Sequence, residues 1–96
     1  MMMHTFLFKW KPEATEAEKE RAAKSIRSFQ GRIPGLLESS YSANASPRSQ
    51  GFTHGGVMKF KDKAAFEAYF VHPQHDELVA WLMPLLEAPA ELDYET

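Results

Sequence analysis

The sequence contains no cysteine. Disulfide frameworks, thiolate nucleophiles and cysteine-based zinc sites are therefore excluded as explanations of its function. It also has no excess of basic residues, because 11 lysines and arginines stand against 13 aspartates and glutamates and give a net charge of −2. This balance argues against a nucleic-acid partner, since nucleic-acid-binding domains usually carry a basic patch.

Long hydrophobic runs are absent as well. The most apolar segment, MMMHTFLFKW at residues 1–10, is interrupted by His4 and Lys9, whereas a membrane-spanning helix needs roughly 18 apolar residues or more. The segment has neither the basic leader nor the small-residue cleavage site that is typical of a signal peptide. We therefore expect a cytoplasmic protein without a membrane partner.

The residues that are present suffice for one small domain. The chain has 96 residues, of which 44% are hydrophobic, so it can form a core but has room for only one domain, residues 1–96. A domain of this size buries only about two-thirds of the surface of its unfolded chain. Association with a partner subunit would add to that burial.

Strand signals occur in four segments, which are rich in aromatic and β-branched residues or alternate between apolar and polar ones. The segments are residues 3–10, 36–44, 52–60 and 90–95. In the first, His4, Phe6 and Phe8 share one face because side chains alternate along a strand. In the third, His54 and Gly56 share one face by the same rule.

Helix signals lie between the strands. Thr15 and Glu18 form a capping box, which predicts a helix that continues to about Gln30. Asp62 is expected to cap a second, short helix, and Pro73 to begin a third, because proline is tolerated in the first turn of a helix.

The resulting order is β-α-β-β-α-β, which predicts an α+β domain of the ferredoxin-like class. Its antiparallel sheet has four strands, with helices on one face and the first and third strands in the centre. His4 and His54 should then point together into the space between the sheet and the helices. Gly56, which has no side chain, is expected to leave room for a ligand there.

The stretch YFVHPQHDE, residues 69–77, places a tyrosine and two histidines around a proline. Histidine changes charge near neutral pH, and tyrosine both donates and accepts hydrogen bonds. The rings could therefore perform proton chemistry. They could equally end one helix and begin the next, and this second interpretation is favoured for His72.

Several motifs together resemble the stress-responsive A/B-barrel family, the dimeric α+β barrel (Dabb) proteins. They are H-x-F-x-F-K-W at the start, the Pro34-Gly35 turn, S-P-R ahead of G-F-T-H, the K-F that ends the third strand, A-Y-F-V-H-P-Q-H and the closing L-D-Y. The resemblance implies a homodimer whose two sheets pack face to face. That would cover the second apolar face of the sheet, which carries Met3, Leu7 and Val57.

The resemblance also implies a chemistry. In the plant polyketide cyclases of this family, a tyrosine and the second histidine of Y-x-x-H-P-x-H close a polyketide without a metal or cofactor. Those positions are Tyr69 and His75 here, and His4 and His54 match the histidines that line the cyclase cavity. We expect the pocket to be completed by Phe6, Phe8, Gly56 and Trp81.

Three functions remain open at this point, and the sequence does not decide whether the protein is an enzyme. The first is a homodimer that binds a small aromatic or carbonyl-bearing molecule, with a cofactor-free cyclase or lyase as one form. The second is a non-catalytic, stress-associated structural dimer, and the third a metal-binding module in which histidines join Asp76 or Glu77. An open pocket of several hundred Å³ between sheet and helices would favour the first function. A pocket filled by the side chains of Phe66 and Trp81 would favour the second.

Overall fold

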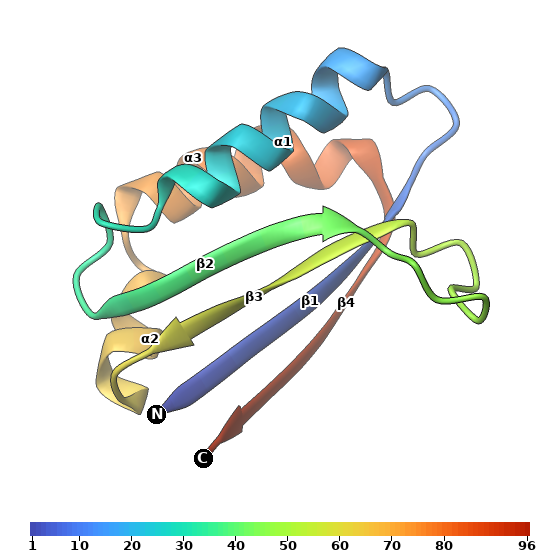
Figure 1. Ribbon diagram of the computed structural model, residues 1–96. Helices are drawn as coiled ribbons and strands as arrows, with labels where there is room; N and C mark the ends of the chain where they lie inside the picture. The colour runs from blue at the N-terminus through green and yellow to red at the C-terminus, as the bar shows by residue number, and fades with distance from the viewer.

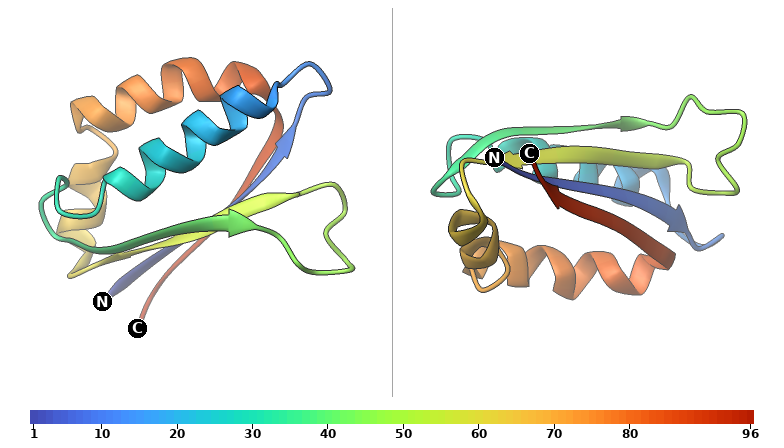
Figure 2. Two further views of the ribbon diagram at one scale, coloured as in Figure 1. Left: turned by 45° about the horizontal axis from the view of Figure 1, so that its top comes forward. Right: turned by 90° about the horizontal axis from the view of Figure 1, so that it is seen from below.

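The computed structural model describes residues 1–96 as one four-stranded antiparallel sheet with helices on one face (Figure 1). The elements are β1 (Met2–Trp10), α1 (Glu16–Ser28), β2 (Leu36–Ala43), β3 (His54–Phe60), α2 (Lys63–Tyr69), α3 (Pro73–Leu82), the 3-10 turn η1 (Met83–Leu85) and β4 (Leu86–Glu95). Both views of Figure 2 show the helices on the same side of the sheet. The predicted ferredoxin-like class is confirmed, with its second helix divided into α2 and α3.

The strand order is β2-β3-β1-β4, so β1 and β3 are central, as predicted. The two termini end side by side, where the Met1 amino group lies 3.4 Å from the Thr96 carbonyl oxygen (Figure 1). None of the helices has the length and hydropathy that crossing a lipid bilayer requires.

The helices begin where the sequence predicts. The Thr15 hydroxyl accepts a hydrogen bond from the Glu18 amide at 3.1 Å, and the Glu18 carboxylate accepts one from the Thr15 amide at 2.9 Å. Asp62 caps α2 by accepting from the Ala65 amide at 2.8 Å. At α3, the Nδ1 atom of His72 accepts from the Gln74 amide at 3.1 Å, so His72 is a helix cap.

Two strand boundaries differ from the prediction by more than one residue. β3 begins at His54 instead of residue 52, because the chain up to Phe52 is still in a turn, closed by the bond from the Phe52 amide to the Ser49 carbonyl. β4 begins at Leu86 instead of residue 90, and it contains Pro89. An edge strand tolerates proline because its second side needs no hydrogen-bond donor.

The core lies between the sheet and the helices, and its most fully buried side chains are Phe60, Ile26 and Met58. The opposite face of the sheet has no helix on it (Figure 2). Leu7, Leu92 and Tyr94 are exposed there. The fold therefore gives one sheet a covered face and an open face.

Candidate small-molecule site

A cavity of about 90 Å³ lies between the covered face of the sheet and the helices. Its polar side chains come from three sources: His4 from β1, Glu91 from β4, and Tyr69 and His75 from the α2–α3 region. The rings of Phe6 and Phe8 form part of its apolar wall. The cavity is smaller than the several hundred Å³ that are typical of a ligand pocket.

His4 is a buried imidazole with a fixed orientation. It lies opposite Asp93 in the β1–β4 register, and its Nδ1 atom is 2.5 Å from an Asp93 carboxylate oxygen. An ionised carboxylate only accepts hydrogen bonds, so Nδ1 carries a proton, and Nε2 has the lone pair whenever the ring is in its neutral form. Only 5% of His4 is exposed, and the rings of Phe66 and Phe70 pack on it.

Tyr69 ends α2 and is 97% buried, since 3% of its surface is exposed. Its ring centroid lies 4.7 Å from that of His75 and 6.3 Å from that of His4. Burial, and secondarily the charge of Glu91, raise the pKa of the Tyr69 hydroxyl. Tyr69 therefore stays protonated at neutral pH and can donate a hydrogen bond.

His75 lies in the first turn of α3. This helix begins at Pro73 and is capped by His72. Its Nδ1 atom is buried without a hydrogen-bond partner, because the nearest Asp76 carboxylate oxygen is 3.9 Å away. Burial lowers the pKa of His75, and the nearby His4 lowers it further, while Asp76 acts in the opposite direction. A neutral imidazole at this position can accept a proton.

Two acidic residues of β4 belong to this site, and neither is among the catalytic or ligand-binding residues that the sequence predicts. Glu91 and Asp93 lie opposite Phe6 and His4 in the register, so both are on the covered face. The closing L-D-Y motif and strand alternation together carry the signal for Asp93. To predict that Asp93 lies beside His4 requires the register between the first and last strands, which the sequence does not supply.

His54 is on the predicted face but not in the cavity. It pairs with Phe8, whereas His4 pairs with Met58, so four residues of about 3.3 Å rise separate their positions along the strand. Its Nδ1 atom accepts a hydrogen bond from the Trp10 indole at 3.1 Å, and its ring stacks on Tyr41 at 6.0 Å. The expectation that both strand histidines line one pocket is corrected: His54 packs at the other end of the sheet.

Gly56 and Trp81 are also outside the cavity lining. A Cβ atom on Gly56 would lie 2.0 Å from the Ser40 carbonyl oxygen and 2.9 Å from the Phe6 ring, so this glycine permits close packing and leaves no ligand space. Trp81 faces α1, where the Arg21 guanidinium lies 3.9 Å from its ring centroid. Trp81 therefore neither lines nor fills the cavity.

The histidines do not form a metal site. His4 is bonded to Asp93, His54 to Trp10, and His72 to the backbone of α3. No group of three or more histidine, aspartate or glutamate side chains converges in a way that could hold an ion. The structure thus offers the metal-binding alternative no ligand set.

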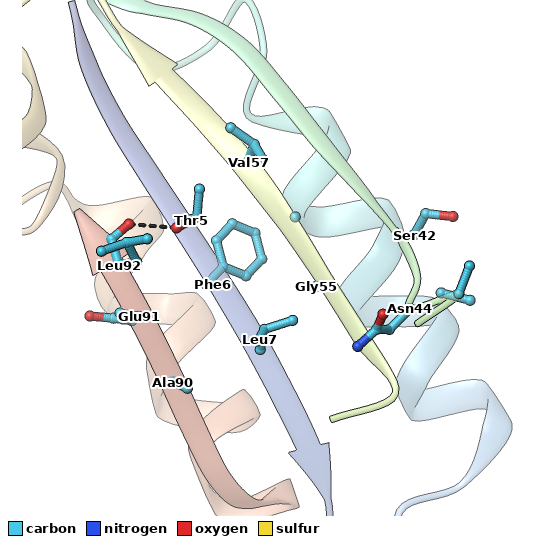
Figure 3. Close-up of a pocket in the computed structure, with 13 residues that line it drawn as sticks. Thr5, Phe6, Leu7, Ser42, Asn44, Gly55, Val57, Ala90, Glu91 and Leu92 are labelled. Carbon is cyan, nitrogen blue, oxygen red and sulfur yellow. Dashed lines mark hydrogen bonds between the residues drawn. The ribbon is translucent and has the colours of Figure 1, made fainter. Parts of the chain in front are cut away.

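The open face of the sheet carries a second, wider hollow of about 510 Å³ (Figure 3). Leu7 and Val57 lie on its floor, as the outer-face pattern of the sequence predicts, and Leu92 lies beside them on β4. Thr5 also lines the groove, and its hydroxyl donates a hydrogen bond to the Leu92 carbonyl. This surface is apolar and faces away from the helices.

Comparison with known proteins gives the geometry a context. The family model described as Stress responsive A/B Barrel Domain matches residues 2–96, which confirms the resemblance that the motifs indicate. Olivetolic acid cyclase from Cannabis sativa is 27% identical over 74 residues, which cover 75% of this chain and 73% of the cyclase.

Two solved structures share the fold. A dimeric ferredoxin-like protein from Thermobifida fusca superposes with a TM-score of 0.86 at 21% identity and covers 99% of this chain and 90% of its own. Hydroxynitrile lyase from Passiflora edulis superposes with a TM-score of 0.88 at 22% identity and covers 97% of this chain and 90% of the lyase. At these identities the likeness concerns the fold.

Proposed function

This chain belongs to the stress-responsive A/B barrel domain family, and from that premise we propose that it binds a small carbonyl compound between sheet and helices and moves a proton on it. The observation that carries the proposal is the meeting of three rings at one cavity. His4 is oriented by Asp93, Tyr69 is kept protonated, and His75 is kept neutral.

Each ring has a role in the proposed step. His75 accepts a proton from the carbon next to the carbonyl group, and the electron pair of that C–H bond moves toward the carbonyl oxygen. Tyr69 donates a hydrogen bond to the enolate oxygen that forms. Neutral His4 can position a ligand that also carries a hydroxyl group, by accepting a hydrogen bond from that hydroxyl through Nε2. The step uses only side chains of this chain, and ring closure or carbon–carbon cleavage can follow from the enolate.

The size of the cavity limits the ligand. A volume of about 90 Å³ is well below the roughly 300–1,000 Å³ of most ligand pockets. Val79 of α3 and Met83 of η1 line the cavity and are 38% and 41% exposed, so they form an apolar mouth. We expect a carbonyl compound with few heavy atoms inside, and any longer apolar part at this mouth.

We further propose that two copies associate through their open faces. The apolar groove of about 510 Å³ would be filled by the partner sheet, and Leu7, Leu92 and Tyr94 would be removed from water. A dimeric neighbour of the same fold supports this assembly. A stable interface of this kind buries at least about 1,200 Å² in total.

A non-catalytic structural dimer is the second candidate. The small volume of the cavity favours it, since most ligand pockets enclose about 300–1,000 Å³. In that case the groove on the open face would be the functional surface, and the cavity would remain empty.

Deuterium exchange tests the catalytic proposal without knowledge of the natural substrate. Cyclopentanone in D₂O near neutral pH exchanges the protons next to its carbonyl group, and proton NMR follows their loss. We expect the wild-type protein to accelerate this exchange above the rate in matched buffer. Absence of acceleration, together with an unchanged melting temperature in the presence of small ketones, would favour the structural dimer.

A further inference from the structure

The cavity has an unbalanced charge. Among its 13 lining residues, Glu91 is the one carboxylate, and there is no lysine or arginine. Glu91 takes part in none of the ion pairs of the structure. Its charge is therefore left to act on whatever enters.

The position of Glu91 is set by the register of the sheet. It lies opposite Phe6, two residues before Asp93, which puts its side chain on the covered face, and because β4 is an edge strand it also borders the groove of the open face. It is an exposed residue that lines the cavity together with Val79 and Met83, which places it at the mouth. A ligand that enters between α3 and β4 passes this carboxylate.

Three cationic side chains of α1, the helix that contributes Ile26 to the lining, are engaged outside the cavity. Arg21 stacks on Trp81, Arg27 donates to the Tyr41 carbonyl at 2.9 Å, and Lys19 pairs with Glu16 at 3.3 Å. The second carboxylate of the region, Asp93, is bonded to His4. When the histidines are neutral, the charges that face a ligand are thus negative only.

We propose that Glu91 makes this cavity select neutral and cationic ligands and reject carboxylates. The inference rests on the proposed function, because it names the class of carbonyl compound that the same site accepts. The aromatic wall agrees with it, since faces of rings such as Phe6, Phe8 and Tyr69 attract cations. Glu91 also raises the pKa of both Tyr69 and His75, which indicates that its charge is felt inside the cavity.

Three ligands of one shape test the selection: benzamidinium, benzamide and benzoate carry charges of +1, 0 and −1. Dissociation constants of the full-length protein are measured by NMR titration at pH 8 and low salt, where histidines are neutral. We expect wild type to bind benzoate at least about tenfold more weakly than benzamidinium, because a carboxylate at the mouth repels one and attracts the other. Benzamide should bind with an affinity between the two.

The variant Glu91→Gln removes the charge and keeps the shape. It should narrow the ratio between benzamidinium and benzoate to within about threefold, and leave benzamide binding nearly unchanged. Glu87→Gln is the matched control, because Glu87 lies on the same strand, is exposed and does not line the cavity. It should retain the wild-type ratio.

The outcomes separate this inference from the function on which it rests. Binding of benzoate as tight as that of benzamidinium in wild type, or an equal ratio in Glu91→Gln and wild type, overturns the charge selection and leaves the ligand site intact. Failure of all three ligands to bind wild type and Glu91→Gln overturns the ligand site and the selection together.

Discussion

The two faces of the sheet are built from the same strands but differ in what they pack against. Along β1, His4, Phe6 and Phe8 are buried under the helices, while Leu7, between two of these residues, is 40% exposed on the open face. Because side chains alternate along a strand, neighbouring residues of β1 lie on opposite faces of the sheet and have different surroundings. The covered face holds the rings that line the cavity, and the open face presents a mainly apolar groove.

The covered face itself is not uniform. At the end near the termini, His4 borders the cavity with Tyr69 and His75, and its Nε2 is left for a ligand. At the other end, His54 is half-buried, is held by Trp10 and Tyr41, and borders a separate, polar hollow of about 150 Å³ next to α1. The comparison shows that two histidines on the same face of a sheet meet different side chains, because they lie at different heights along their strands.

The largest expected effect separates His75 of α3, which lines the cavity, from His54 of β3, which does not. His75→Ala should reduce the protein-catalysed rate of cyclopentanone exchange by about 10²- to 10⁴-fold, because it removes the proton acceptor. His54→Ala should change that rate by less than about threefold, since His54 packs away from the cavity and makes no contact with the reacting group. If both variants were folded by circular dichroism and lost the same fraction of the exchange rate, the assignment of His75 as the proton acceptor would be contradicted.

A charge on the open face should break the proposed dimer. Leu7→Arg places a guanidinium in the apolar groove, and we expect the dissociation constant of the dimer to rise by about 100-fold or more, because an unpaired charge would be buried. Analytical ultracentrifugation measures this constant. Val71→Arg introduces the same side chain at a position that is 78% exposed and lies between α2 and α3, away from the groove. If Val71→Arg weakened the dimer as much as Leu7→Arg, the open face would not be the interface.

The bond between His4 and Asp93 joins the covered face to the edge strand, and its removal should cost stability. Asp93→Ala leaves the Nδ1–H group of buried His4 without an acceptor, so the free energy of unfolding should fall by about 1–3 kcal/mol. Asp93→Asn retains an acceptor oxygen and should lose less than half as much. Urea titration compares the two variants, and equal losses would show that the carboxylate charge matters more than the hydrogen bond.

The sequence predicts most of the fold because the fold depends on local signals. Capping at Thr15 and Asp62 and alternation along residues 3–10 are properties of a few neighbouring residues, and each predicted element is present. The site was harder to predict. The resemblance indicated Tyr69 and His75 correctly as neighbours of His4, whereas the placement of His54 depended on the register between two strands.

The same limit explains the other corrections. Gly56 suggested an opening, but the strand beside it brings the Ser40 carbonyl so close that no space is left. Trp81 suggested a pocket wall, but the rotation of α3 about its axis turns it toward Arg21. Both errors concern how elements are placed relative to one another, which no short segment of sequence records.

The smallest expected effect is a dependence of stability on pH that comes from His75 and His54. Burial lowers the pKa of both His75 and His54 in the folded protein, while in the unfolded chain each keeps its ordinary value near 6.5. Between these values the unfolded chain binds more protons, so the free energy of unfolding falls as the pH drops below about 6.5 and is unaffected by these groups above it. In His75→Gln one of the two contributions is absent. The melting temperature of wild type should therefore fall between pH 8 and pH 5 by about 2–4 °C more than that of His75→Gln, as measured by scanning calorimetry. Parallel curves for the two proteins would mean that His75 titrates in the folded state as it does in water, and that the cavity does not exclude its charged form.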